Sequence, residues 1–364
     1  MKVKGTSYIY LDYTSKLFMK IKNQPENLIE WVALKANLAP TPLIDTQVAF
    51  NAARAIMAAA ELGIYEAIGK NSKTAGELAA ECKTHPEATK HLLDCLVGIG
   101  YLQWSNEKYS VKPKYHKWLL KESDSNLIGK LRFQLIEWEW MGKLEEYVRT
   151  GKKLDLHGTA SAKEWQLYQE GMRDLSINVA KELASKIPVP KNATNMLDIG
   201  GSHGLFSIEL CKKHPGLSST ILELPGAIEA ASAIAKRYDT TNRVTYAAGN
   251  ALNDDLGTEK YDMVMINNVV HHFTNEQNFA LAKKIAAALK PGGVHAIGEF
   301  VKASKPGEGG VVGATSGLYF SLTSSSGTWS VPEIEAWQKN AGLKIEKPVA
   351  PMSMPGWKIF IARK

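Results

Sequence analysis

The chain contains only three cysteines among its 364 residues, and none of them lies in a CxxC pair. Cys82, Cys95 and Cys211 therefore cannot form a disulfide framework or a four-cysteine metal site. The sequence also lacks any run of about 20 apolar residues, and its first residues lack the apolar core of a signal peptide. We therefore expect a cytoplasmic protein with no membrane segment and no bound metal.

A block of charge of one sign is absent as well. The 44 Lys and Arg residues exceed the 37 Asp and Glu residues by seven, and this excess is spread over both halves of the chain. The phosphate-binding motif GxxxxGK[ST] is also missing. The even spread of charge gives little support to a nucleic-acid-binding module, and the missing motif argues against a ligand held by a phosphate-binding loop. The hydrophobic content of 45% is typical of a soluble globular protein, and the length predicts two domains of ordinary size.

The first half of the chain shows mainly helical patterns. Apolar residues recur at helical spacing over 46–67, and shorter helices are expected over 74–80 and 86–96. Two strands within 100–111, joined by Ser-Asn-Glu-Lys, complete the pattern of a winged helix. Residues 127–186 predict further helices with many large apolar side chains, and the prolines that follow indicate a boundary near 187–193. We therefore divide the chain into 1–120, a helical connector over 121–190, and 191–364.

The second half alternates between strand and helix patterns. Strands are expected at 195–199, 219–224, 244–248, 261–267, 293–300, 344–349 and 357–362. Such alternation predicts an α/β fold with a mostly parallel sheet covered on both faces. Only seven residues separate the last two strands, too few for a crossover helix, so these strands should be antiparallel neighbours.

Polar and glycine residues follow the predicted strands at their carboxyl ends, where a doubly wound sheet binds its ligand. The run Asp198-Ile-Gly-Gly-Ser-His-Gly204 follows the first strand, and its spacing is GGxxG rather than GxGxxG. Glu223 follows the second strand and has acceptors for two ribose hydroxyls. Gly249-Asn250 follows the third, and Asn267, Asn268 and His271 follow the fourth. This pattern favours a ligand that contains adenosine but no pyrophosphate.

These motifs resemble, in order, those of the S-adenosylmethionine-dependent O-methyltransferases. This family includes plant caffeate and flavonoid, acetylserotonin, and bacterial antibiotic O-methyltransferases. The resemblance is carried by 198–204, Leu222-Glu-Leu-Pro225, Gly249-Asn250, Val270–Glu276, Leu289–Gly293 and 333–343, and in the first domain by Ala52-Ala-Arg-Ala and Leu62-Gly-Ile-Tyr65. It implies a class I methyltransferase fold with a Rossmann-like seven-stranded sheet. It also implies an N-terminal helical and winged-helix domain that forms a homodimer.

The resemblance further implies S-adenosyl-L-methionine as cofactor. The matching cofactor residues are Gly200, Gly201, Ser202, Glu223, Leu224, Gly249, Asn250, Ala251 and Asn267. Four of them depart from the family pattern: Ser202 replaces a glycine, Glu223 replaces an aspartate, Asn250 replaces an acid and Asn267 replaces a lysine. The cofactor pocket is therefore expected to keep its shape but to be less acidic.

The family's catalytic histidine corresponds to His271, the expected general base, and Glu299 corresponds to the glutamate that orients it. A second family glutamate falls near Val331 and is missing; Glu333 is interpreted instead as a charge at a helix N-terminus. The expected acceptor residues are Met172, Trp138, Trp165, His272 and Phe320, which suggest a flat aromatic molecule. The same aromatic side chains are equally consistent with packing between domains.

Our leading hypothesis is methylation of a hydroxyl, phenolic or otherwise aromatic, on a small secondary metabolite. Methylation of carbon or nitrogen by the same fold is the alternative. A hypothesis of a different class makes the winged helix a DNA reader. The helix over 86–96 argues against it, because Lys90 and His91 are its only basic residues and no arginine is available to bind guanine.

Overall fold

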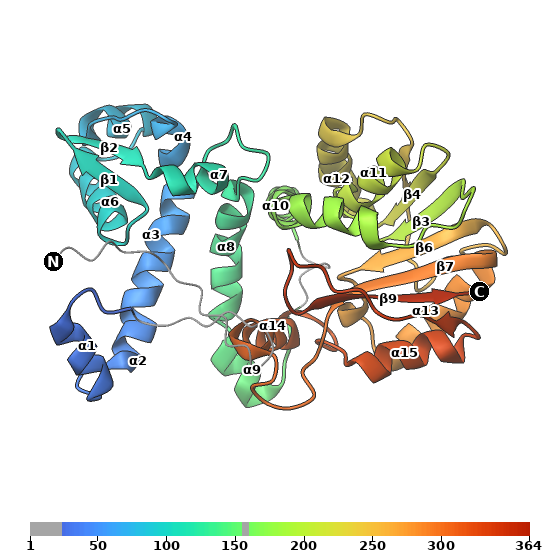
Figure 1. The fold of residues 1–364 in the computed structure, drawn as a ribbon. Coiled ribbons are helices and arrows are strands. Elements are labelled where there is room, and N and C mark those ends of the chain that lie inside the picture. Colours follow the sequence, from blue (N-terminus) through green and yellow to red (C-terminus); the bar gives the residue numbers. More distant parts are fainter. Residues whose placement is uncertain (1–23, 155–159) are drawn as a thin grey trace.

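The computed structural model describes residues 24–154 and 160–364. Figure 1 shows a helical unit in the N-terminal part of the chain and a larger α/β unit that ends at the C-terminus. The seven-stranded sheet and the N-terminal helical domain that the sequence predicts are both present.

The N-terminal unit contains most of the short helices. They are α1 (Leu28–Lys35), α2 (Thr41–Leu43), the π-helix η1 (Ile44–Val48), α3 (Ala49–Glu61), α4 (Ile64–Ile68), α5 (Ala75–Cys82) and α6 (Pro86–Gly98). The single helix predicted over 46–67 is wrong, because the chain turns at Gly63. Gly63 has a φ of +73°, a left-handed conformation that ends α3 and lets α4 start in a new direction.

A two-stranded antiparallel sheet completes this unit. It consists of β1 (Leu102–Ser105) and β2 (Lys108–Val111), as the winged-helix pattern predicts. Asn106 and Glu107 between them both have positive φ, as the tight turns of β-hairpins require. The short η2 (Pro113–Tyr115) and α7 (His116–Leu119) lead out of the unit. Its core is separate from that of the sheet and contains Ile64, Tyr65, Leu78, Leu93 and Leu96.

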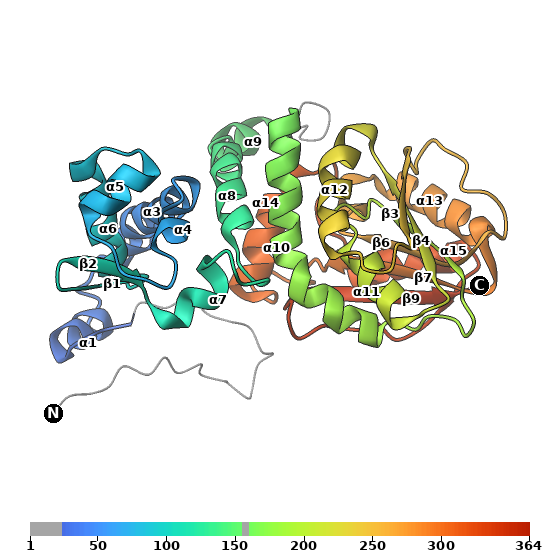
Figure 2. The ribbon, with the colours of Figure 1, turned by 90° about the horizontal axis from the view of Figure 1, so that it is seen from above.

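The connecting segment forms α8 (Ile128–Met141), α9 (Leu144–Thr150) and α10 (Ala162–Lys186). Helix α10 begins with a capping box between Ser161 and Glu164. It packs against α8 on one side and against α11 (Leu205–Lys213) and α12 (Pro225–Tyr238) on the other. Figure 2 shows α10 lying between α8 and the helices that cover one face of the sheet.

The large sheet has the strand order β5-β4-β3-β6-β7-β9-β8. Its strands are β3 (Asn195–Ile199), β4 (Ser218–Glu223), β5 (Val244–Ala248), β6 (Tyr261–Asn267), β7 (Leu289–Phe300), β8 (Lys344–Ile345) and β9 (Trp357–Arg363). Only β9 runs antiparallel to its neighbours, β7 and β8, as expected for the last two strands. The strand order reverses between β3 and β6, where an open α/β sheet forms its ligand crevice.

Helices cover both faces of this sheet. Helices α10, α11 and α12 lie on one face, and α13 (Asn275–Ala288) and α15 (Val331–Asn340) lie on the other (Figure 1). In β6, Met263 and Met265 pack in the core that includes residues of α10, α11 and α12. Val264 and Ile266 pack in the core that includes residues of α13 and α15. This alternation follows the period of two along a strand and leaves β6 apolar on both faces.

Most predicted strand limits agree with the structure to within one residue, but those of β7 and β8 differ by more. Strand β7 starts at Leu289 rather than 293, since Leu289 pairs with Tyr261 before the register shifts around the turn at Gly292. Strand β8 ends at Ile345 rather than 349, because Pro348 has no N–H to continue the ladder, and Val349 forms only an isolated bridge with Ile359. Among the described residues, no helix is long and apolar enough to cross a membrane.

His295 lies in the middle of β7, paired in register with Val264 and Ala362. It is 1% exposed, and neither ring nitrogen has a hydrogen-bond partner in the described ranges. Burial lowers the pKa of His295 from 6.5 to about 3, so the folded protein keeps the ring neutral. The unfolded chain binds a proton below pH about 6.5, and stability should therefore fall as the pH falls from there toward 3.

We expect His295→Leu to reduce this acid sensitivity. Between about pH 6 and pH 4 the variant should lose less unfolding free energy than the original chain, by up to about 1.4 kcal/mol per pH unit. Urea unfolding at several pH values measures the difference. The same substitution at the exposed His91 is the control and should leave the pH slope unchanged. Equal slopes for His295→Leu and the original chain would refute the explanation.

Candidate active site

A cavity of about 560 Å³ opens at the carboxyl ends of β3, β4, β5 and β6 and is closed on one side by α10. This volume lies within the range of small-molecule sites. All nine predicted cofactor residues line it: Gly200, Gly201, Ser202, Glu223, Leu224, Gly249, Asn250, Ala251 and Asn267. The reversal of strand order thus places segments far apart in the sequence around one space.

The glycine-rich turn after β3 holds its shape through backbone geometry. Gly200 has a φ of +64°, and its N–H donates to the carbonyl of Leu222 at 2.8 Å. Ser202, at the position where the family has glycine, also has a left-handed φ of +51°. Its strained backbone is held by the Tyr246 hydroxyl, which donates to the Ser202 carbonyl at 2.8 Å, and by a hydrogen bond from the Ser202 hydroxyl to Gln169.

The side chain of Asp198 packs against the backbone of this turn at Gly201. Its side chain is fully buried, and one carboxyl oxygen accepts a hydrogen bond from Ser207 at 2.7 Å. Burial raises the pKa of Asp198 to about 7. A Cβ added to Gly201 would lie 2.5 Å from the same carboxyl group, so glycine is required there. Asp198 therefore shapes the turn, and it does not line the cavity.

Glu223 lies at the end of β4 and is 8% exposed. One carboxylate oxygen accepts from the Ser202 N–H at 3.1 Å and the other from the Leu224 N–H at 2.8 Å. Burial raises the pKa of Glu223, and these two backbone donors oppose that rise. Each oxygen has a further lone pair, so the carboxylate remains able to accept hydrogen bonds from a ligand.

The two asparagines of the site differ in how they are bonded. The side-chain oxygen of Asn250 accepts the Leu252 N–H at 3.0 Å, so it is already used within its own turn. Asn267 has no partner for either side-chain polar atom within the described chain, although both atoms are buried. A Cβ on Gly298 would lie 2.2 Å from the Asn267 oxygen, so Gly298 leaves room for this amide. An unsatisfied buried amide in a cavity wall indicates a ligand position.

His271 lies in the short helix η3 (Val270–His272) after β6, and Glu299 lies near the end of β7. The Nδ1 atom of His271 is 2.8 Å from a carboxylate oxygen of Glu299. The other Glu299 oxygen accepts the Phe300 N–H at 2.8 Å, which fixes the carboxylate. With Nδ1–H donating to Glu299, the remaining ring nitrogen carries a free lone pair.

The predicted acceptor residues lie in three different places. Trp165, Met172 and His272 line the cavity. Phe320, in α14 (Gly310–Thr323), is not among the residues that line the cavity. Its ring centroid lies 4.3 Å from that of His271. Trp138, on α8, is not among the residues that line this cavity, and its ring centroid lies 5.8 Å from the guanidinium carbon of Arg54. Its helical position turns it toward the N-terminal unit instead of the sheet.

The predicted role of Glu333 at a helix N-terminus is confirmed. Glu333 forms a capping box with Ser330 at the start of α15, and both the hydroxyl and the N–H of Ser330 donate to its carboxylate. Glu333 is therefore occupied by its own helix and is not a substitute for the missing second glutamate.

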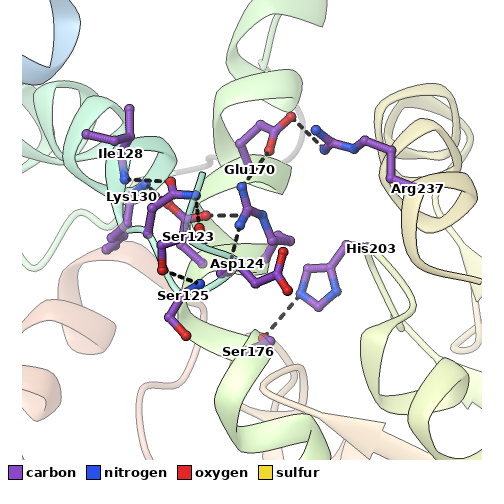
Figure 3. Close-up of polar contacts among 12 residues, drawn as sticks. Ser123, Asp124, Ser125, Ile128, Lys130, Glu170, Ser176, His203 and Arg237 are labelled. Atoms are coloured by element: carbon purple, nitrogen blue, oxygen red, sulfur yellow. Dashed lines mark hydrogen bonds and ion pairs between the residues drawn. The ribbon is translucent and has the colours of Figure 1, made fainter. Parts of the chain in front are cut away.

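A buried charged network lies on the side of α10 that faces the N-terminal unit. Arg173 forms an ion pair with Asp174 at 3.1 Å, and the second oxygen of Asp174 accepts the backbone N–H of Lys130 at 2.8 Å. Burial raises the pKa of Asp174 to about 6, against the lowering effect of Arg173. Glu170 of α10 extends this network to α12, because its carboxylate forms an ion pair of 2.8 Å with Arg237 (Figure 3).

His203, which follows Ser202 in the glycine-rich turn, also contacts α10. Its Nδ1 accepts the Leu205 N–H at 3.2 Å, and its Nε2 lies 3.2 Å from the Ser176 hydroxyl (Figure 3). Burial lowers the pKa of His203 to about 3, so the ring is neutral and donates through Nε2. The turn is thus tied to α10 twice, by Ser202 to Gln169 and by His203 to Ser176.

Comparison with known proteins decides the family. A family model described as the O-methyltransferase domain matches residues 146–329, just over half of the chain. The chain belongs to the O-methyltransferase family. A second model, the O-methyltransferase dimerisation domain, matches residues 44–117 and so favours dimerisation over DNA reading for the N-terminal unit.

Three relatives show how far the similarity extends. The tetracenomycin polyketide synthesis 8-O-methyltransferase of Streptomyces glaucescens is 26% identical over 70% of this chain and 76% of its own. The 3-hydroxy-5-methyl-1-naphthoate 3-O-methyltransferase of Streptomyces sahachiroi is 24% identical over 83% and 89%. The structure of human N-acetylserotonin methyltransferase with S-adenosylmethionine has a TM-score of 0.75, with 16% identity over 94% and 99%. The chain is thus an S-adenosylmethionine-dependent O-methyltransferase of the secondary-metabolite type.

The residues of this O-methyltransferase fit the cofactor of its family. The Glu223 carboxylate suits a ribose diol, and Asn267, whose amide has no partner in the described residues, lines the same cavity. No group of three or more His, Cys, Asp or Glu side chains in the described part of the chain could hold a metal ion.

Sequence reasoning missed several wall residues of the methyltransferase. Gln169 and Ser176 line the cavity together with Trp165, Met172 and Tyr168, all from one side of α10. Their spacing of three or four residues places them on one helical face, and this period was the available signal. His203, inside the predicted glycine-rich run 198–204, and Ser324, inside a Gly- and Ser-rich segment over 303–330, also line the cavity. Lys153 lines it as well, and no sequence pattern marked it.

Proposed function

We propose that this methyltransferase methylates a phenolic hydroxyl of a small aromatic acceptor, with His271 as general base. The observation that carries the proposal is the 2.8 Å contact between His271 Nδ1 and Glu299 beside a cavity lined by all nine predicted cofactor residues. Bound S-adenosylmethionine would supply an electrophilic methyl group on a sulfonium. Glu223 would hold its ribose, and Asn250 and Asn267 would contact its adenosine part.

The role of His271 follows from the weak nucleophilicity of a phenol. A phenol with a pKa near ~10 is mostly protonated at neutral pH, and an imidazole with an ordinary pKa of ~6.5 is a suitable base. Glu299 keeps Nδ1 protonated, so the other nitrogen is left to take the phenol proton. His271 is 2% exposed, and the Phe320 ring covers it. The proposal therefore requires the Phe320 ring to move aside when the acceptor enters.

An aromatic acceptor suits the apolar part of the wall. Trp165, Met172 and Phe273 line the cavity, and Trp165 is 8% exposed. The name of the Streptomyces sahachiroi relative describes a hydroxynaphthoate as its acceptor, which supports an acceptor of this size. Flat apolar side chains bind aromatic rings through area burial and stacking.

We further propose that the enzyme acts as a homodimer. The dimerisation-domain match supports this assembly. Several large apolar side chains near the start of the described chain are exposed: Leu28, Ile29, Trp31, Val32, Leu43, Val48 and Phe50. Contiguous exposed apolar side chains are typical of an interface.

Substituting Glu223 tests the cofactor assignment. Glu223→Gln replaces one acceptor oxygen with an NH₂ group, so it cannot accept from both Ser202 and Leu224 while also binding a diol. We expect the affinity for S-adenosylhomocysteine, measured by calorimetry, to fall about tenfold or more. Glu229→Gln, on the exposed side of α12, is the control and should bind normally. Unchanged affinity in Glu223→Gln would refute the ribose role.

The activity itself is tested with a panel of phenols, catechols, flavonoids, hydroxyindoles and hydroxynaphthoates in the presence of S-adenosylmethionine. We expect at least one hydroxyl compound to gain the mass of one methyl group. Transfer only to amine or carbon acceptors in a parallel panel would overturn the hydroxyl assignment while leaving the family unchanged.

A further inference from the structure

The acceptor end of the cavity has a polar wall that the proposed mechanism does not use. Lys153 and Leu154, from the segment after α9, line the cavity together with Thr323, the last residue of α14, and Ser324 and Ser325, which follow it. The two segments are joined by the Leu154 N–H, which donates to the Leu322 carbonyl at 2.9 Å. The Ser326 N–H donates to the His271 carbonyl at 3.2 Å, so this wall lies beside the proposed base.

Ser324 is the least satisfied group in this wall. Its side chain is 2% exposed, and its hydroxyl has no hydrogen-bond partner in residues 24–154 and 160–364. The neighbouring Thr323 hydroxyl, by contrast, donates to the Tyr319 carbonyl at 2.8 Å. A buried hydroxyl without a partner costs free energy, and its place in a cavity wall indicates that a ligand atom supplies the missing bond.

Lys153 adds a positive charge at the same place. It is half-buried, and its ammonium group donates to the Ser325 carbonyl at 2.5 Å. An ammonium has three donors, so two remain. Within the described chain Lys153 forms no ion pair, and the only carboxylate among the cavity-lining residues is Glu223 at the cofactor end. Among residues 24–154 and 160–364, the acceptor end therefore carries a cation without a matching anion.

We infer that Lys153 and Ser324 form a subsite for an ionised carboxylate on the aromatic acceptor. The inference rests on the proposed function, since it names the class of acceptor for the same cavity. A carboxylate can accept one hydrogen bond from the ammonium and one from the serine hydroxyl, which satisfies both groups at once. The acceptor class is thus a hydroxylated aromatic carboxylic acid, with the acid group next to the wall formed by 153 and 323–325.

The test compares acids with their uncharged esters. The probes are 3-hydroxy-2-naphthoate and 6-hydroxy-2-naphthoate, each with its methyl ester, titrated by calorimetry into protein saturated with S-adenosylhomocysteine. At least one acid should bind about tenfold or more tightly than its ester, as expected for hydrogen bonds to a charged group. Lys153→Met should bring the acid-to-ester ratio close to one, Lys153→Arg should retain most of it, and Ser324→Ala should reduce it several-fold.

Lys152→Met is the matched control, because Lys152 is exposed and lies outside the cavity wall. It should keep the acid preference of the original chain. Equal binding of acids and esters, no binding of either, or an unchanged ratio in Lys153→Met would each overturn the subsite. A methyl-transfer assay on the same compounds separates the two proposals. Acid-selective binding without transfer to a hydroxyl would contradict the proposed function but support the subsite, and transfer without acid preference would do the reverse.

Discussion

Replacing His271 with alanine should lower kcat by ~10²–10⁴-fold while leaving the affinity for S-adenosylhomocysteine unchanged. The imidazole is held by Glu299 at 2.8 Å, and His271 is not among the residues that line the cavity around the predicted cofactor position. Its removal therefore takes away the base without altering the cofactor cradle. Steady-state kinetics with an acceptor found in the panel, together with calorimetry, measure the two quantities.

Two further variants separate proton removal from packing. Glu299→Gln keeps the shape of the partner but loses its charge, so kcat should fall, though less than in His271→Ala. His272→Ala alters the cavity wall and should mainly raise KM. If His271→Ala retained full turnover, or if only His272→Ala abolished it, His271 would not be the base.

Replacing Asp174 with alanine should destabilise the protein by about 3–5 kcal/mol. The side chains of Asp174 and Arg173 are both almost fully buried. Without Asp174, the nearest carboxylate to Arg173 is Glu170 at 3.7 Å, and the Lys130 N–H loses its acceptor. The buried guanidinium is then poorly compensated. The free energy of unfolding in urea measures the loss.

A double substitution tests whether the unpaired charge is the cause. Arg173→Met combined with Asp174→Asn removes the charge and keeps an acceptor for Lys130, so it should be clearly more stable than Asp174→Ala alone. Glu335→Ala, which breaks the more exposed pair with Lys339, should cost about 0.5 kcal/mol or less. A loss below about 1 kcal/mol in Asp174→Ala would show that the buried network contributes little to stability.

The cofactor end of the site could be predicted from the sequence because its residues are fixed by strand ends. The loops that follow the strands of a parallel sheet all lie at the same edge of that sheet. Once the strands are predicted, the residues at their carboxyl ends are expected to lie together; these are Gly200, Glu223, Gly249 and Asn267. The pairing of His271 with Glu299 follows for the same reason, since β6 and β7 are neighbours.

The acceptor end was harder to predict because helices and loops form it. Trp138 and Trp165 both lie in helical patterns rich in apolar residues, and only the packing of α8 and α10 decides which of them reaches the cavity. Lys153 and Ser324 lie 171 residues apart in the sequence, and their segments meet through the hydrogen bonds from Leu154 to Leu322 and from Lys153 to Ser325. No local pattern encodes such a contact. The prediction of a single helix over 46–67 was wrong because a glycine such as Gly63 can either end a helix or continue it.

Methyl transfer with S-adenosylmethionine labelled with ¹³C in its methyl group tests the central claim most directly. The product of the best acceptor from the panel is examined by NMR, for the original chain and for His271→Ala. We predict one new methyl signal bonded to an aromatic hydroxyl oxygen, and a large loss of that signal in the variant. A methyl group on nitrogen or carbon, or equal product from both proteins, would contradict the account.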